Sequence, residues 1–323
     1  MANNTFKEIA DVLLRAENIL IYPHINADGD AAGSAAALCH GLRSLGKTAY
    51  ILIEDQLPAN LRVMERGYFT FDESVIKDPD VSVCVDCGDY SRFPIRRSKF
   101  DSAQTTVCID HHGTTDCFCD YNYVDPKAAA TGELIYALIK AMGVKPDVET
   151  GEAIFAAITT DTGNFQYSNT TKNCHVIMAE LFDLGVDTNK VSVEIYENER
   201  PEKLMITTRA LSTLEIFGNG KGAIAYITMA DMDEIGAEPF ETDSVIENLR
   251  SISGVEYAAF VKEKEPGVIR VSLRAKRRGD VAAIASELGG GGHVKAAGCT
   301  LHMTVEEAVD LMKSKLSEAI DTL

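Results

Sequence analysis

Acidic and histidine side chains gather in four short segments of the chain. The segments are His24 to Asp30, Val85-Asp86, Asp110-His111-His112 and Thr160-Asp161. Carboxylates and imidazoles without thiolates suit a hard or borderline divalent cation. Two such ions about 3.5–4 Å apart are the arrangement used for in-line attack on phosphorus. The residue types therefore indicate metal-assisted hydrolysis of a phosphoester.

Each segment taken alone has a simpler interpretation. Asp28 followed by Gly29 suits a turn that caps a helix, without any metal. A lone carboxylate after a strand often caps the next helix, and paired histidines can be hydrogen-bonded structure. The repetition of such segments where strands and helices end favours a shared metal site.

The elements that would position these residues alternate between apolar β runs and helical patterns. This alternation predicts an α/β fold with a mostly parallel sheet and helices on both faces. Ligands of open α/β sheets bind outside the carboxyl ends of the strands. The predicted strands are 19–22, 49–53, 81–85 and 106–109, and the predicted helices are 31–45, 131–141, 148–159 and 173–184.

The periodicity breaks around Glu197 to Glu202, and a smaller α/β pattern follows. Its predicted strands are 223–229, 257–262 and 268–274, and its predicted helices are 244–251, 281–288 and 305–320. We therefore expect a metal-binding domain over residues 1–190, a linker over 191–215 and a smaller glycine-rich domain over 216–323.

The net charge of the chain limits the kinds of molecule that it is expected to bind. The 323 residues carry a formal net charge of -18, which opposes binding of long nucleic acids, because such binding depends on Lys and Arg at phosphates. A small anionic substrate is compatible with this charge. No apolar stretch approaches the roughly 20 residues of a membrane span, and no signal peptide is evident, so we expect a cytoplasmic protein without membrane contact. The eight cysteines are expected to be reduced thiols.

In their order along the chain, the acidic and histidine segments resemble the four motifs of the DHH phosphoesterase family, whose name matches Asp110-His111-His112. The glycine-rich run Gly289 to Gly298 resembles the substrate domain associated with that family. The resemblance covers nearly the whole chain. Two departures are Ala27, where the family frequently has proline, and Thr115, where it frequently has asparagine. Neither removes a ligand, but Thr115 could alter the hydrogen bonds around the site.

The resemblance implies a role for each residue of the metal-binding segments. His24, Asp28 and Asp86 would hold one ion, and Asp30, Asp86, His111 and Asp161 would hold the other. Asp86 would then bridge the two ions. The residues implied to be catalytic are Asp86, Asp110, His111 and His112. Of these, His112 would face the substrate phosphate, and Asp110 would orient a histidine.

The predicted substrate contacts lie mainly in the second domain. The resemblance implies a phosphate-binding arginine at Arg274. Gly290, Gly291 and Gly292 before His293 could form a nest of backbone amides for a phosphate, and a flexible hinge is the alternative. Asn164 is a candidate contact for a base or sugar, whereas the neighbouring Phe165 is expected to pack in the core. His40 and His302 have no acidic neighbours in sequence, and no function is predicted for them.

The compact two-domain form resembles the oligoribonuclease (nanoRNase) and pAp phosphatase branch of the family. That branch implies hydrolysis of short RNA oligonucleotides to nucleoside monophosphates, or of 3'-phosphoadenosine 5'-phosphate to AMP, with two divalent ions. Mn²⁺ is the expected ion, with Mg²⁺ and Co²⁺ as alternatives. A hydrolase of cyclic dinucleotides or their linear products is an alternative, and a non-catalytic nucleotide-binding regulator is another. A homodimer is implied by the family alone.

Overall fold

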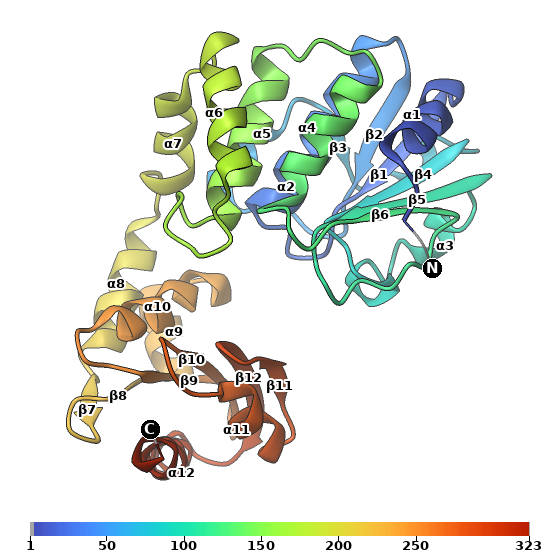
Figure 1. Ribbon diagram of the computed structural model, residues 1–323. Coiled ribbons are helices and arrows are strands. Elements are labelled where there is room, and N and C mark those ends of the chain that lie inside the picture. Colours follow the sequence, from blue (N-terminus) through green and yellow to red (C-terminus); the bar gives the residue numbers. More distant parts are fainter. Residues whose placement is uncertain (1–2, 323) are drawn as a thin grey trace. The chain divides into compact units, whose positions relative to one another are not determined.

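The chain folds into two compact units, one ending at Asn198 and the other beginning at Glu199. The structure, a computed structural model, describes residues 3–322. Each unit is built around its own six-stranded sheet (Figure 1). The α/β class and the presence of a second, smaller α/β domain are confirmed.

The sheet of the N-terminal unit is parallel throughout, in the order β3-β2-β1-β4-β5-β6. The chain therefore changes direction across the sheet between β1 and β4, the point at which doubly wound sheets open a crevice for ligands. The strands are β1 (Asn18–Tyr22), β2 (Thr48–Leu52), β3 (Phe69–Thr70), β4 (Val81–Val85), β5 (Thr105–Asp110) and β6 (Tyr121–Val124).

The two faces of this sheet are covered differently. One face packs with α1, α2, α4 and α5 in the main core, and the other packs against an aromatic cluster that includes Phe93 and Phe100. The helices are α1 (Phe6–Arg15), α2 (Gly29–Ser44), α3 (Arg97–Phe100), α4 (Thr131–Ala141), α5 (Val148–Asp161), α6 (Lys172–Asp183) and α7 (Thr188–Tyr196). Short 3-10 turns span Ala59–Met64, Glu73–Val75 and Tyr90–Arg92.

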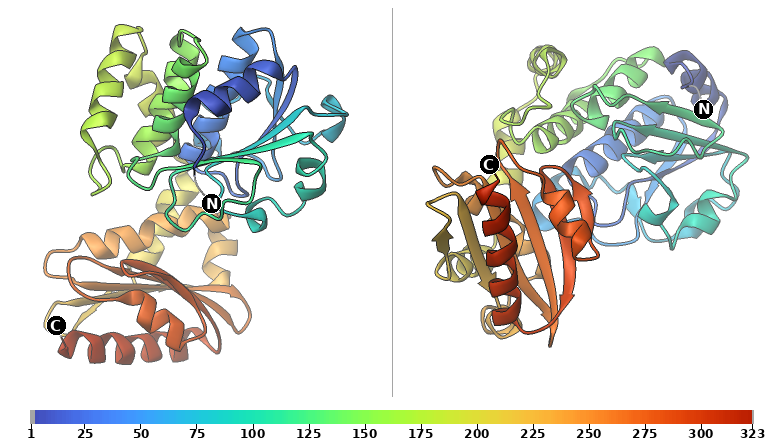
Figure 2. Two further views of the ribbon diagram at one scale, coloured as in Figure 1. Left: turned by 45° about the vertical axis from the view of Figure 1, so that its right-hand side comes forward. Right: turned by 60° about the horizontal axis from the view of Figure 1, so that its bottom comes forward.

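The C-terminal unit has a mixed sheet in the order β11-β12-β10-β9-β8-β7, with only β8 and β9 parallel among its described pairs. One face packs against α11 and α12 and the other against α8, α9 and α10 (Figure 2). The strands are β7 (Glu215–Phe217), β8 (Gly222–Ile227), β9 (Tyr257–Glu265), β10 (Val268–Ala275), β11 (Gly291–His293) and β12 (Ala296–His302). The helices are α8 (Pro201–Leu211), α9 (Met229–Ile235), α10 (Asp243–Ser251), α11 (Val281–Glu287) and α12 (Val305–Asp321), with a 3-10 turn over Pro239–Thr242.

The region between the two predicted domains is helical. Residues 191–215, expected to link the domains, contain the end of α7 and all of α8. The domain limits at 190 and 216 stay a prediction. No helix within residues 3–322 is long and apolar enough to cross a membrane.

Helices α2 and α5 cross closely because α2 is rich in small residues. A Cβ atom at Gly33 would lie 2.5 Å from the carbonyl oxygen of Ala153 and 2.9 Å from the amide nitrogen of Ala157. These are backbone atoms, so the helices would have to separate to admit it. The close crossing matters for the site because α2 begins beside Asp30 and α5 ends at Asp161.

We predict that Gly33→Ala lowers the free energy of unfolding by about 1–2 kcal/mol, because overpacking against backbone outweighs the gain in helix propensity. Gly41→Ala in the same helix is the matched control, since its Cβ would meet only the Ile139 side chain, at 3.2 Å. Scanning calorimetry of the whole chain should place the Gly41 variant at or above wild type. Equal stability of the two variants would show that the crossing tolerates the methyl group.

Candidate metal centre

The acidic and histidine segments meet at the carboxyl edge of the N-terminal sheet. Strand β1 leads to His24, β4 leads to Asp86, and β5 ends at Asp110, next to His111 and His112. The ligand-type atoms form three groups, and within each group they lie within 4.8 Å of one another. The groups are His24, Asp28 and Asp86; Asp30, His111 and Asp161; and Asp86, His111 and His112.

Asp86 belongs to two of these three groups. It is 3% exposed, and its φ of +56° lies in the left-handed region, which is uncommon for a residue other than glycine. Its amide donates to the carbonyl of Ile109, which holds this turn against β5. The backbone therefore turns sharply at the end of β4 and presents a buried carboxylate at the sheet edge.

The two oxygens of Asp86 face two different imidazoles. Oδ2 lies 3.6 Å from Nε2 of His24, and Oδ1 lies 3.7 Å from Nε2 of His111. These separations are too long for direct hydrogen bonds. They leave room for a cation on each side of one carboxylate.

The orientation of both histidines fits this interpretation. Nδ1 of His24 lies 2.7 Å from the carbonyl oxygen of Ile25, and Nδ1 of His111 lies 3.2 Å from that of Ala128. A carbonyl only accepts, so each Nδ1 carries a proton and each Nε2 is directed at the carboxylates. Nε2 of His111 is buried and has no hydrogen-bond partner among the described residues. This buried nitrogen, which faces carboxylates without bonding to them, is placed to share a cation with them.

Asp30 and Asp161 complete the His111 side of the centre. Nε2 of His111 lies 3.8 Å from Oδ2 of Asp30 and 3.6 Å from Oδ2 of Asp161. Burial, together with the charges of Asp86 and Asp161, raises the pKa of Asp30 well above its ordinary value. Burial raises the pKa of Asp161 to about 6, even though the charge on His111 opposes the rise. Both carboxylates are therefore costly to ionise without a neighbouring cation.

Asp28 fits both interpretations of its segment, as a helix cap and as a metal ligand. Its Oδ1 accepts hydrogen bonds from the amides of Asp30, at 3.1 Å, and Ala31, at 3.0 Å, and so caps α2. Its Oδ2 lies 3.8 Å from Nε2 of His24. Burial opposes the charge on His24, yet the carboxylates of Asp28 and Asp86 raise the pKa of this histidine to about 10. One carboxylate thus caps a helix and also contributes to the acidic cluster.

His112 projects beyond the cluster and is held from behind by Asp110. Its Nδ1 lies 2.8 Å from Oδ1 of Asp110, and this hydrogen bond raises the pKa of His112 to about 9. The His112 side chain is 48% exposed, whereas Asp110 is fully buried. Thr115 donates its hydroxyl proton to the other oxygen of Asp110, so this departure from the family pattern still serves the carboxylate.

Several contacts of the acidic cluster come from residues that the sequence analysis did not single out. The side chains of Thr131, Ser34 and Asn169 donate to Asp86, Asp30 and Asp161, respectively. The one local indication was Ala130, a residue without a capping side chain directly before a predicted helix. Ser34 lies only 4 residues from Asp30, about one helical turn, and Asn169 lies 8 residues from Asp161, but Thr131 lies 45 residues from Asp86, and periodicity could not reveal that contact.

The C-terminal unit has a separate pocket with a basic lining. The pocket, of about 570 Å³, is lined in part by Lys262, Arg270, Ser272, Arg274 and Gly292, together with one acidic residue, Asp243. Nε of Arg274 donates to Oε1 of Glu247 at 2.8 Å. Lys262, Arg270 and the unshared donors of Arg274 give the pocket the character of an anion site.

The glycine run forms regular structure beside this pocket. Gly291–His293 is strand β11, paired with β12, and His293 is exposed. A Cβ at Gly290 would lie 2.2 Å from the carbonyl oxygen of Gly298, so the backbones approach more closely than a side chain allows. In the N-terminal unit, Asn164 is exposed with a left-handed φ of +55°, and Phe165 packs against the core as expected.

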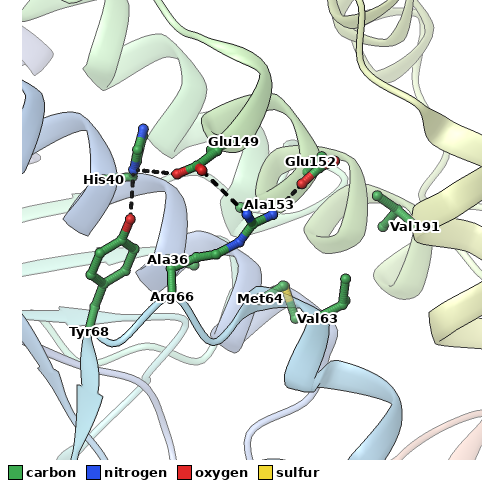
Figure 3. A pocket seen from close by; sticks show the side chains of 10 residues that line it. All are labelled: Ala36, His40, Val63, Met64, Arg66, Tyr68, Glu149, Glu152, Ala153 and Val191. Carbon is green, nitrogen blue, oxygen red and sulfur yellow. Dashed lines mark hydrogen bonds and ion pairs between the residues drawn. The ribbon is translucent and has the colours of Figure 1, made fainter.

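His40 corrects one expectation. No acidic partner was evident in sequence, but its Nε2 lies 2.8 Å from Oδ2 of Asp147 and its Nδ1 lies 3.3 Å from Oε2 of Glu149. It lines a pocket with Arg66 and Tyr68 in which the polar groups satisfy one another (Figure 3). The sequence missed this network because Asp147 is 107 residues away.

Comparison with known proteins agrees with this arrangement. The family described as "DHH family, N-terminal domain" matches residues 18–162, and the "DHHA1 domain" matches residues 219–322. The protein named "Bifunctional oligoribonuclease and PAP phosphatase NrnA" of Thermus thermophilus is 32% identical over 96% of this chain and 94% of its own length. The chain belongs to the DHH family.

Two further proteins are similar to this DHH protein over nearly its whole length. The "Cyclic-di-AMP phosphodiesterase PdeA" of Listeria monocytogenes is 24% identical over 97% of this chain but only 49% of its own length. The crystal structure of an exopolyphosphatase-related protein from Bacteroides fragilis is 25% identical, with a TM-score of 0.90, and covers 98% of this chain and 96% of that one. Both units of the chain therefore have counterparts in one solved DHH-type structure.

We predict opposite pH dependences with and without metal. The raised pKa values of His24 and His112 stabilise the fold fully below about pH 6.5, and this stability is lost as pH rises toward 9 and 10. The raised pKa of Asp161 destabilises the metal-free fold, and this destabilisation is fully developed above about pH 6. The melting temperature in EDTA should therefore fall between pH 6 and 8.5, whereas the rise caused by Mn²⁺ should grow, because ligands must lose protons to bind it.

Scanning calorimetry at several pH values, with EDTA or with Mn²⁺, measures both trends. Asp86→Asn is the matched control, since asparagine tolerates the left-handed φ and keeps the side-chain shape. This variant should lose most of the Mn²⁺ effect without losing metal-free stability. A Mn²⁺ effect that does not depend on pH, or that survives in Asp86→Asn, would contradict the assignment.

Proposed function

We propose that the protein is a two-metal phosphoesterase that converts short RNA oligonucleotides to nucleoside monophosphates and 3'-phosphoadenosine 5'-phosphate to AMP. The observation that supports it most directly is the carboxylate of Asp86, whose two oxygens face His24 and His111. A carboxylate shared in this way suits a pair of cations. Membership of the DHH family and the name of the Thermus thermophilus relative point to the same chemistry.

The proposed ligand set follows the two sides of Asp86. His24 and Asp28 would hold one ion with Asp86, and the donors on the other side would be Asp30, His111 and Asp161 together with Asp86. The nitrogen and oxygen donors favour Mn²⁺, with Mg²⁺ and Co²⁺ as alternatives. When bound, the two ions would activate water and neutralise charge that develops on the phosphoryl group.

The residues around the ions would orient the substrate. His112 is exposed and backed by Asp110, so its outward edge can donate to a phosphate oxygen while Asp110 stabilises its positive charge. Asn164 follows the end of α5 and is exposed near Asp161 in sequence, which supports a contact with sugar or base. In the DHHA1 domain, Arg274 and the glycine strand would bind a phosphate group, with His293 beside them.

The charge of the chain supports small substrates. A net charge of -18 weakens any general attraction to long nucleic acids, so recognition has to be local.

The similarity to PdeA supports a second candidate, hydrolysis of cyclic dinucleotides or their linear products. A non-catalytic regulator is less well supported, because every proposed metal ligand is present and gathered in the structure. A cytoplasmic location and a homodimer remain predictions.

Product release from a set of substrates tests this proposal. Purified protein with Mn²⁺ should cleave a di- or trinucleotide RNA and pAp rapidly, and cleave a cyclic dinucleotide and pyrophosphate slowly. Asp86→Asn should lower kcat by at least about 10³-fold, because the proposed ions would share this ligand. Preference for the cyclic dinucleotide would favour the second candidate, and absence of turnover would favour the regulator.

Arg274→Ala separates substrate binding from metal binding in the same assay. We expect it to raise KM for the short RNA by about 10–100-fold, the cost of losing a charge-assisted hydrogen bond, with metal content unchanged. Loss of bound metal in this variant would show that its role has been misassigned.

A further inference from the structure

The start of helix α4 lies against the acidic cluster and lacks a cap of its own. Its N-cap residue is Ala130, which makes no side-chain capping hydrogen bond. The first amides of a helix have no partners within the helix and need acceptors from elsewhere. In α4, the first two amides find their acceptor in Asp30, a proposed metal ligand.

Asp30 serves as the cap in place of Ala130. The amide of Thr131 donates to Oδ2 of Asp30 at 2.7 Å, and the amide of Gly132 donates to Oδ1 at 2.9 Å. A Cβ atom at Gly132 would lie 2.6 Å from the Cβ of Ala157, so glycine lets the helix approach α5 closely enough for this contact. The carboxylate of Asp30 is thereby fixed through both of its oxygens.

The side chain of the same residue reaches the second carboxylate. The hydroxyl of Thr131 donates to Oδ1 of Asp86 at 2.9 Å, and Thr131 is fully buried. This Oδ1 is the oxygen that faces His111, while Oδ2 faces His24. Thr131, the first residue of α4, therefore contacts both Asp30 and Asp86.

The hydroxyl matters because a carboxylate rotates easily. The terminal torsion of aspartate has a broad, roughly two-fold preference, so Asp86 needs an outside contact to hold its plane. The hydrogen bond from Thr131 holds one oxygen and so directs both, because they are rigidly joined. Partners of this kind typically change metal affinity by about 10–100-fold.

We propose that Thr131 is a positioning residue that sets the plane of the Asp86 carboxylate, so that one oxygen faces each proposed cation. This inference rests on the proposed two-metal function. It predicts that loss of the Thr131 hydroxyl weakens binding at both positions together, since both share Asp86. Loss of a hydroxyl that serves only one position should weaken one.

Ser34 offers the matched contrast. Its hydroxyl donates to Oδ1 of Asp30 at 3.0 Å and is fully buried, like that of Thr131. Asp30 belongs to the His111 side of the centre and not to the His24 side. Ser34→Ala and Thr131→Val each remove one buried hydroxyl, but only the second removes a contact to the shared carboxylate.

Calorimetric titration of the metal-free whole protein with Mn²⁺ tests the proposal without substrate. Wild type should bind two ions. Thr131→Val should bind both about 10–100-fold more weakly, Thr131→Ser should recover to within about threefold of wild type, and Ser34→Ala should weaken one ion at most. The kcat for short RNA at saturating Mn²⁺ should fall in Thr131→Val more than KM rises.

Three results would overturn the proposal: wild-type Mn²⁺ binding in Thr131→Val, equal weakening in Thr131→Ser and Thr131→Val, or weakening of both ions by Ser34→Ala. Melting in EDTA checks that each variant is folded, and Thr131→Ala replaces Thr131→Val if the valine variant is not. Failure of wild type to bind two ions would instead refute the two-metal function on which the inference rests.

Discussion

Repulsion among buried carboxylates is the constraint around which the N-terminal unit is organised. Asp30 and Asp86 are almost fully buried, and Asp28 and Asp161 complete the acidic group around them. No arginine or lysine forms an ion pair with these four side chains among the described residues. Their charge is met by protons on histidine and aspartate, or by cations that take the place of those protons. A fold that holds such a group gains little stability from it, and its use is chemical.

The scaffold converts this costly group into a defined geometry. Parallel strands that are buried on both faces bring their carboxyl ends to one edge, and the change of strand order between β1 and β4 opens that edge. Close crossing of α2 and α5 at Gly33 brings two further carboxylates to the same place. The amides and hydroxyl at the start of α4 then fix the carboxylates individually.

Much of the fold and most of the candidate site could be predicted from sequence, because both depend on local patterns. The strand at 81–85 and the helix at 131–141 follow from apolar runs and periodicity, and Asp86 follows from its place after a strand. The contact of Thr131 with Asp86 could not be predicted in this way. Thr131 lies 45 residues from Asp86, and only the tertiary fold brings them together. Strand β6 was also missed, since its residues, Tyr121–Val124, are only partly buried at the sheet edge.

The central claim is that Asp86 lies between two cations, and anomalous diffraction tests it most directly. Crystals grown with Mn²⁺ and measured at the manganese absorption edge should show two peaks, one on the His24 side of Asp86 and one on the His111 side. The separation expected for a shared carboxylate is about 3.5–4 Å. One peak only, or two peaks that do not share Asp86, would contradict the account.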